Sequence, residues 1–419
     1  MKYPEVVKVK QRFPSGKIEN IEKHLTEELK HQLPAVQKGA SIAITVGSRG
    51  ISNRVSIVKT VVDYLKGQGA APFIIGAMGS HGGGTPEGQM DVLESLGFTE
   101  EAIGCPVRTS ATVVEVGTTD IGFTLYCDKM AWESDGIIVM NRVKLHTSFR
   151  GPNESGLLKM ITVGLGKAKG ANQLHRQGPP NMSKTVQEVG RGMINTGKIL
   201  AGIGIVENSF DETAHLEVIH PQSILERERE LLLLSKEYFP RIPIEQLDLL
   251  IVKKMGKNYS GTGMDTNVLG RTKIFGVPEP QTPSFKRIGV LDLDDSSHGN
   301  ATGIGLADLT TERLFQKIDR QKTYLNCLTS TYVQRAMIPM VLDTEQELVN
   351  KAIDSLAVED PTALRVAIIE NTLDLETLYL SHNLIEEAGE QIDVMSDSEP
   401  IAFTEDGELN YFLGSAGGH

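Results

Sequence analysis

The sequence predicts an α/β protein of two domains with mostly parallel sheets. Short apolar runs alternate along the chain with longer segments of helical periodicity, the pattern of strand–helix–strand units. Glycine is abundant (42 of 419 residues), whereas aromatic residues make up only 5%. Glycine suits the tight turns between strands and helices, and the length favours two domains.

In the first part of the chain, strands are expected where short apolar runs occur. These runs cover residues 41–46, 72–77, 136–140, 201–206 and 249–252. Helices are expected where apolar residues recur at helical spacing, over residues 56–69, 86–96 and 184–196. The order of these segments predicts a larger N-terminal α/β domain over residues 1–276.

A proline-rich segment, GVPEPQTP at residues 276–283, predicts a linker over residues 277–283. Beyond it, a smaller C-terminal α/β domain is expected over residues 284–400, with the active site in the cleft between the domains. Its expected strands cover residues 287–291 and 365–370, and its expected helices cover residues 306–318 and 344–355. Residues 401–419 form a tail that could pack back on the first domain or fray.

Charge and cysteine content exclude several classes of protein. The net charge is −12 and no basic stripe occurs, which argues against nucleic-acid binding. No apolar stretch approaches the roughly 20 residues of a membrane span. Cys105, Cys127 and Cys327 lack a C-x-x-C spacing, so no cysteine-based metal centre is expected. The first residues show no secretory signal, and we expect a cytoplasmic protein with buried free thiols.

Three polar residues follow three expected strands. Arg49 comes after the strand at 41–46, His81 after the strand at 72–77, and His146 after the strand at 136–140. Ligands of α/β sheets bind at the carboxyl ends of strands, so these side chains are expected on one rim. Taken singly, His81 also fits an incidental turn histidine, and His146 a solvated loop.

Lys159 stands alone among Leu, Met, Ile and Val residues. Partial desolvation would favour its neutral, nucleophilic amine, although a snorkelling lysine at a helix end fits the same pattern. His175 lies sixteen residues further along. By itself it fits a surface or capping residue as well as a metal ligand.

Two glycine-rich loops follow strands later in the chain. The loop at 256–271 contains Lys257 and is a candidate active-site loop. The loop at 292–308 contains Asp294, Asp295 and His298, which either bind a divalent cation or cap the loop; the sequence leaves its role open. Signatures of a P-loop, a G-x-S-x-G elbow, an H-E-x-x-H helix and a dinucleotide-binding turn do not occur.

Taken in order, these segments resemble the nickel-pincer lactate racemase family. The resemblance rests on Arg49, the turn Gly79-Ser80-His81, His146, the segment SGLLK ending in Lys159, and His175. It covers about residues 40–180 in motifs and spacing, and the rest in domain plan only. It implies a racemase or epimerase, an isomerase that inverts the C2 centre of a small 2-hydroxy acid.

The resemblance also implies the cofactor and the roles of four residues. Lys159 would tether a nickel pincer nucleotide, a pyridinium-3,5-bisthiocarboxylic acid mononucleotide, and His175 would bind its nickel. His81 and His146 would act as acid and base on opposite faces of C2 while hydride moves to the cofactor and back. The enzymes that build the cofactor would be partners; the oligomeric state is left open.

A carboxylate beside the reacting carbon needs a fixed cation, and Arg49 can bind it bidentately. Ser80 and Lys257 are the further expected substrate contacts.

The sequence departs from the family pattern at three places. Val46 stands where the family often has an aspartate, Pro152-Asn153-Glu154 lengthens the segment between His146 and Lys159, and Leu157 and Leu158 replace favoured glycines. These changes predict a substrate larger than lactate or differently charged, such as a sugar acid.

Two other functions fit the same residues. One is a zinc-dependent hydrolase using His81, His146 and His175. The other is a non-enzymatic binder that closes on an acidic metabolite through Arg49 and Lys144.

Overall fold

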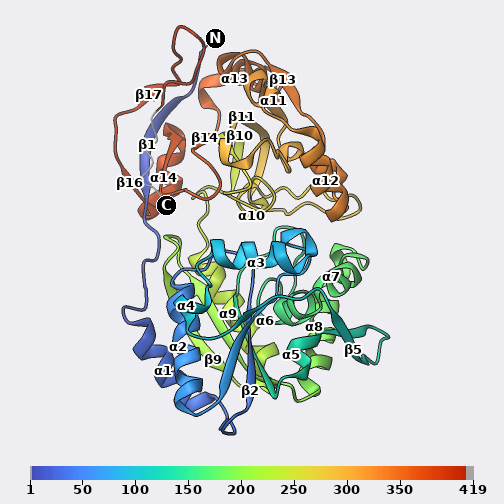
Figure 1. The fold of residues 1–419 in the computed structure, drawn as a ribbon. Coiled ribbons are helices and arrows are strands. Elements are labelled where there is room, and N and C mark those ends of the chain that lie inside the picture. The colour runs from blue at the N-terminus through green and yellow to red at the C-terminus, as the bar shows by residue number, and fades with distance from the viewer. Residues whose placement is uncertain (1, 412–419) are drawn as a thin grey trace. The chain divides into compact units, whose positions relative to one another are not determined.

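The computed structural model describes residues 2–411. Residues 14–239 form one compact unit, and residues 2–13 join residues 240–411 in a second unit. Strand β1 (Glu5–Gln11) accordingly pairs with strands from the end of the chain, which Figure 1 shows as a blue strand beside red ones. The predicted fold class is confirmed: both units are α/β, and most strand pairs in their large sheets are parallel.

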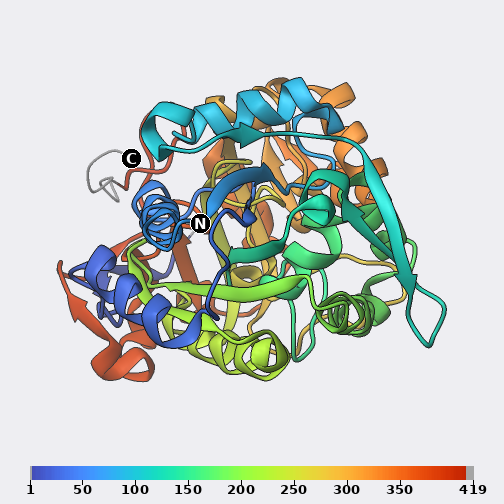
Figure 2. The same cartoon turned by 60° about the horizontal axis from the view of Figure 1, so that its bottom comes forward.

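The large sheet of the 14–239 unit has the order β4-β3-β2-β7-β8-β9. All of its pairs are parallel except β8 with β9. Its strands are β2 (Ser41–Val46), β3 (Ala71–Gly76), β4 (Val107–Arg108), β7 (Gly136–Arg142), β8 (Ile199–Glu207) and β9 (Thr213–Ile219). A separate hairpin of β5 (Val113–Thr118) and β6 (Thr124–Asp128) projects from the unit (Figure 1, Figure 2).

Helices cover both faces of this sheet. Successive residues of a strand point to opposite faces, so each strand contributes apolar side chains to both core clusters. On β7, Ile138 and Met140 pack in one core cluster, whereas Ile137 and Val139 pack in the other. The first cluster includes residues of α1 (Ile21–Gln32), α2 (Arg54–Gly67), α3 (Pro86–Ser95) and α4 (Glu100–Ile103). The second includes residues of α5 (Lys129–Glu133), α6 (Leu157–Lys159), α7 (Lys167–His175), α8 (Pro179–Asn195) and α9 (Ile224–Tyr238).

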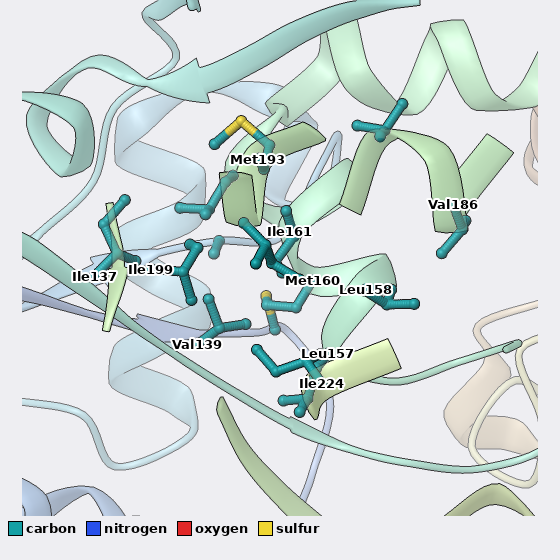
Figure 3. Packing of buried hydrophobic residues seen from close by; sticks show 14 of the residues in the cluster. Ile137, Val139, Leu157, Leu158, Met160, Ile161, Val186, Met193, Ile199 and Ile224 are labelled. Carbon is teal, nitrogen blue, oxygen red and sulfur yellow. The ribbon is translucent and has the colours of Figure 1, made fainter. Parts of the chain in front are cut away.

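Lys159 belongs to a short helix that is embedded in the second core cluster. Its neighbours Leu157, Leu158, Met160 and Ile161 are all buried and pack among residues of β7, β8, α8 and α9 (Figure 3). A π-helical segment, η2 (Met160–Leu165), follows directly. The apolar neighbours of Lys159 are packed on several sides, and this packing fixes the position of the backbone that carries Lys159.

The large sheet of the second unit is mixed. Its order is β13-β12-β11-β10-β14-β15-β1-β16, with β17 also paired to β1. The strands besides β1 are β10 (Gln246–Met255), β11 (Ser284–Leu293), β12 (Leu309–Thr311), β13 (Met340–Leu342), β14 (Val366–Ile369), β15 (Thr377–Ser381), β16 (Ile392–Val394) and β17 (Glu399–Pro400). The helices are α10 (Thr266–Leu269), α11 (Glu312–Gln316), α12 (Arg320–Ser330), α13 (Glu345–Asp354) and α14 (Ile385–Ala388).

The expected domain boundary near residue 276 needs correction. Strands β10 and β11 are parallel neighbours in one sheet, so residues 277–283 connect two strands within a unit and are not a linker between domains. The chain passes between units near residues 13–14 and 239–240 instead. Of the predicted tail, Ile401, Leu409 and Tyr411 pack in the core of the second unit, not on the first; residues 412–419 lie outside the described range.

The predicted helix over residues 306–318 is also wrong in its first half. Leu309 and Thr310 pair with Gly289 and Val290 as strand β12, and the α-helix is limited to Glu312–Gln316. Thr311 ends the strand and caps that helix by accepting a hydrogen bond from the Leu314 N–H. Threonine is common both in strands and at helix N-caps. The apolar residues of this segment have helical spacing, but their pairing in the sheet determines the structure.

The other predicted strands and helices are present, with ends shifted by a few residues. Among the helices of residues 2–411, none is long and apolar enough to cross a membrane.

Candidate active site

The turns after β2 and β3 press against the segment that carries Lys159. Gly79 has φ of 61°, and a Cβ there would lie 3.1 Å from a methyl group of Val163. A Cβ on Gly164 would lie 2.9 Å from the carbonyl oxygen of Ala77. Glycine is favoured at position 79 by the positive φ and at position 164 by the close backbone of Ala77.

His81 lies in the turn after β3 and is exposed. Its Nδ1 forms a hydrogen bond with Oγ of Ser48, from the turn after β2. Behind the histidine, Gln89 donates a hydrogen bond from Nε2 to the Gly79 carbonyl at 3.2 Å. Thr85 caps α3 by accepting a hydrogen bond from the Gly88 N–H at 3.1 Å. Hydrogen bonds therefore connect the turn that carries His81 to the turn after β2 and to helix α3.

His146 lies in a loop closed by the pairing of Lys144 with Ser155. The Ser148 N–H donates to Nδ1 of His146 at 3.0 Å, and the ring lies 4.3 Å from that of Phe149. Burial lowers the pKa of His146 well below its usual value, and nearby cations, first Lys159, lower it further. The ring is therefore neutral near pH 7, and the bond from Ser148 leaves its proton on Nε2.

Lys159 is partly buried, and its amine has no hydrogen-bond or ion-pair partner among the described residues. Burial, and then the charge of Arg49, lower the pKa of the Lys159 amine to about 8. Arg49 is exposed and likewise lacks an ion-pair partner in residues 2–411; the protein around it still lowers its pKa by desolvation. Arg49 and Lys159 are thus within electrostatic reach of each other, and no carboxylate of residues 2–411 pairs with either.

His175 is the last residue of α7 and is accessible to solvent. The surrounding protein lowers the pKa of His175, and the charge of Lys159 lowers it further. The imidazole is therefore neutral near pH 7, the state in which histidine binds metals.

The sequence-predicted residues divide between the two units. Arg49, Ser80, His81, His146, Lys159 and His175 all belong to the 14–239 unit. Lys257 belongs to the other unit, where its amine donates hydrogen bonds to the Gly261 carbonyl at 2.6 Å and Oδ1 of Asn326 at 3.1 Å. Substrate contacts by Ser80 and Lys257, and a site in a cleft between domains, stay predictions.

The three-histidine zinc site is not formed. Within residues 2–411, no group of three or more His, Cys, Asp or Glu side chains is placed to hold a metal ion. The Asp294 loop serves as a cap: Asp294 accepts hydrogen bonds from the Ser296 N–H at 3.0 Å and the Tyr259 hydroxyl at 2.7 Å, and Asp295 pairs with Lys317 at 3.1 Å.

Two buried carboxylates near the site were missed by the sequence analysis. Glu154 and Glu228 are 1% and 0% exposed and accept hydrogen bonds from the backbone around His146 and Lys159. A signal for Glu228 was present, because it lies four residues after the buried Ile224 and three before the buried Leu231. That spacing places it on the buried face of α9.

A buried ion pair near the site was also missed. The Lys167 amine lies 3.2 Å from Oδ2 of Asp128, and both side chains are at most 2% exposed. Lys167 also donates to the Gly76 carbonyl, at the end of β3. No spacing rule predicts this pair, which joins residues far apart in the sequence.

Comparisons with known proteins support the fold. A family model described as a domain of unknown function (DUF362) matches residues 45–225, the part that holds the candidate site. A search of curated proteins found no match. Among solved structures, the lactate racemase apoprotein from Thermoanaerobacterium thermosaccharolyticum is similar, with a TM-score of 0.54 and 11% identity. The likeness covers 88% of this chain and 99% of that one. It shows a shared fold and supports at most a distant relationship.

Proposed function

We propose that this chain is an isomerase that inverts the C2 centre of a small 2-hydroxy acid. The observation that carries the proposal is the half-buried Lys159 amine together with the exposed Arg49, whose charge lowers the Lys159 pKa; neither has an ion-pair partner among the described residues. An anion bound beside them would be attracted by both charges, and burial already favours the neutral form of the Lys159 amine. The likeness to a lactate racemase adds support at the level of fold.

Arg49 supplies the cation for the substrate. Its guanidinium has five donors in a planar fork, which matches a carboxylate in two parallel hydrogen bonds. Because no carboxylate of the described residues pairs with Arg49, the fork is available to a ligand. This assigns Arg49 to the substrate's carboxylate, with Ser80 and Lys257 as further proposed contacts.

Lys159 and His175 fit a nickel pincer nucleotide in their chemistry. With a pKa of about 8, roughly a tenth of Lys159 is neutral at pH 7, against about one part in 3,000 for an ordinary lysine. A neutral amine is the form that can be acylated, and a neutral imidazole suits nickel. When bound, this cofactor would take up and return the hydrogen of C2 with its electron pair.

The two histidines would handle the hydroxyl proton. When Ser48 accepts the Nδ1 proton of His81, Nε2 of the neutral ring is unprotonated, the form in which it can act as a base. His146 has its proton on Nε2, so it is set to donate a hydrogen bond. In this resting state the two rings differ, and His81 is the base for the first enantiomer. For inversion, the histidine that returns the proton has to be an imidazolium, so His146 would have to gain a proton before it could act as the acid.

The non-enzymatic binder remains the second candidate, because Arg49, which has no ion-pair partner among the described residues, would serve a binder equally well. The zinc-dependent hydrolase loses its support with the absence of a three-ligand cluster in the described range. For the racemase, the required partners are a 2-hydroxy acid and the enzymes that build the cofactor. A cytoplasmic location is part of the proposal, since cofactor assembly must reach the folded chain.

A racemisation assay tests the proposal. The wild type, His81→Ala and His146→Ala are produced together with the cofactor-building enzymes and incubated with single enantiomers of a panel of 2-hydroxy acids. Chiral chromatography follows the appearance of the other enantiomer. Loss of either histidine should lower turnover by roughly 100-fold or more. The exposed His31, at the end of α1, gives the control variant His31→Ala, which should keep the wild-type rate.

The same assay separates the two candidates. A binder would hold the acid without interconverting its enantiomers, and its affinity would be the same in the His81→Ala and His146→Ala variants. Unchanged turnover in both variants would contradict the proposed acid–base pair.

A further inference from the structure

The segment between His146 and Lys159 is built around buried polar groups. Asn153 and Glu154, from the three-residue stretch that lengthens this segment, are 0% and 1% exposed. Buried carboxylates are rare unless they satisfy several hydrogen-bond donors. The donors here come from the two stretches of backbone that carry His146 and Lys159.

Glu154 holds the His146 loop. Its Oε2 accepts a hydrogen bond from the His146 N–H at 2.7 Å, and its Oε1 accepts from the Gly151 N–H at 3.4 Å. The guanidinium of Arg150 lies 4.0 Å away. One carboxylate thus fixes the backbone of the histidine from inside the loop.

Glu228 holds the start of the Lys159 helix. Its Oε2 accepts from the Leu158 N–H at 2.8 Å, and its Oε1 accepts from Nδ2 of Asn153 at 3.1 Å. The Glu228 carboxylate lies close to the backbone of Gly156, where an added Cβ would be 2.6 Å from Oε2. The first N–H groups of a helix have no partner within it, so this carboxylate serves as the cap of α6, which has no other side-chain cap.

Glu228 acts on Lys159 through the backbone. No ion pair joins the two side chains in the described part of the chain, and Glu228 is not among the charges that shift the Lys159 pKa. Asn153 links the two carboxylates, because it bonds Glu228 and directly precedes Glu154. A chain of hydrogen bonds therefore connects Glu228 of α9, through the lengthened segment, to the backbone beside Lys159 and at His146.

We propose that Glu154 and Glu228 are positioning residues that set the places of His146 and Lys159 in the proposed site. The proposal rests on the proposed function only for what the two positioned side chains do. It assigns the lengthened stretch at residues 152–154 a role in building the site.

The experiment compares Glu228→Gln and Glu154→Gln with the matched control Glu230→Gln. Glu230 is exposed on the same helix and pairs with Arg227. Glutamine has the shape of glutamate, but an NH2 group replaces one of the two carboxylate oxygens. That NH2 group would then face an N–H group that now donates to the carboxylate. Hydrogen–deuterium exchange resolved by residue reports the Leu158 and His146 amides. Competitive acetylation across pH, read by peptide mass spectrometry, reports the apparent pKa of Lys159.

Glu228→Gln should speed exchange of the Leu158 amide by roughly tenfold or more, because glutamine offers one acceptor oxygen to the two N–H groups that Glu228 binds. It should also raise the acetylation midpoint of Lys159 from about 8 toward 10.5, as the amine becomes better solvated. Glu154→Gln should speed exchange of the His146 amide and leave Leu158 unchanged. Glu230→Gln should change neither amide nor the midpoint.

The proposal is overturned if folded Glu228→Gln shows wild-type exchange at Leu158 and a wild-type midpoint. If Glu228→Gln does not fold, Glu154→Gln decides, and wild-type exchange at His146 overturns the proposal. A wild-type Lys159 midpoint near 10.5 would instead count against the proposed function. The amide exchange would still test the positioning role by itself.

Discussion

Replacing Lys159 by methionine should stabilise the protein near neutral pH. Burial and the charge of Arg49 disfavour the protonated amine in the folded state and lower its pKa from 10.5 to about 8. Methionine keeps the unbranched apolar chain and removes the charge. The prediction is unusual because most substitutions of buried groups destabilise.

The magnitude follows from the shift. A group whose folded pKa is lowered contributes its full stability above pH 10.5 and loses it as the pH falls from 10.5 to about 8. Near pH 7, the protonated lysine therefore costs at most roughly 3 kcal/mol, and solvent at the partly exposed amine reduces that figure. At pH 9.5 the same cost is roughly 1.5 kcal/mol.

Urea unfolding of wild type and Lys159→Met at pH 7 and pH 9.5 measures the effect. The variant should have the larger free energy of unfolding at both values, with the smaller gain at pH 9.5. Lys184→Met, an exposed lysine on α8, should show no such gain. A Lys159→Met variant that is less stable than wild type at pH 7, or a gain that grows with pH, would refute the reasoning.

Three further predictions concern charges around the site. Arg49→Ala should raise the pKa of Lys159 above about 8, because a repelling cation is removed. Competitive acetylation across pH measures this pKa as the midpoint of Lys159 acetylation. An unchanged midpoint would argue against electrostatic coupling between Arg49 and Lys159. Lys167→Met should destabilise the protein by about 3–5 kcal/mol in urea unfolding, since it leaves Asp128 buried and unpaired; a loss under about 1 kcal/mol would contradict this. Burial raises the pKa of Glu228 from 4.5 to about 7, so its contribution to stability is full below pH 4.5 and is lost as the pH rises through about 7. The free energy of unfolding should therefore fall with pH over this range less steeply in Glu228→Gln than in wild type, and equal slopes would refute the assignment.

Local patterns in the sequence predicted the α/β class and the rim residues. Apolar runs such as residues 41–46 and 136–140 form buried strands because both faces of the sheet are covered. The polar residues after them lie where parallel strands end. Arg49, His81 and His146 follow β2, β3 and β7 within the 14–239 unit, as expected.

Long-range pairing accounts for what was missed. The first strand, β1, pairs with strands more than 300 residues later, and no local pattern indicates that partner. The prolines after residue 276 indicated a break in secondary structure, but a loop within a sheet and a linker between domains share that composition. Glu154 was placed in a lengthened loop, yet its burial depends on contacts that the loop sequence does not contain.

Intact-protein mass spectrometry with metal analysis tests the central claim most directly. The wild type and Lys159→Ala would be expressed together with the cofactor-building enzymes. The account predicts nickel and a covalent adduct of the mass of a mononucleotide on the wild type, both absent from the alanine variant. A wild-type protein with no adduct on Lys159, under conditions in which a known lactate racemase acquires one, would contradict it.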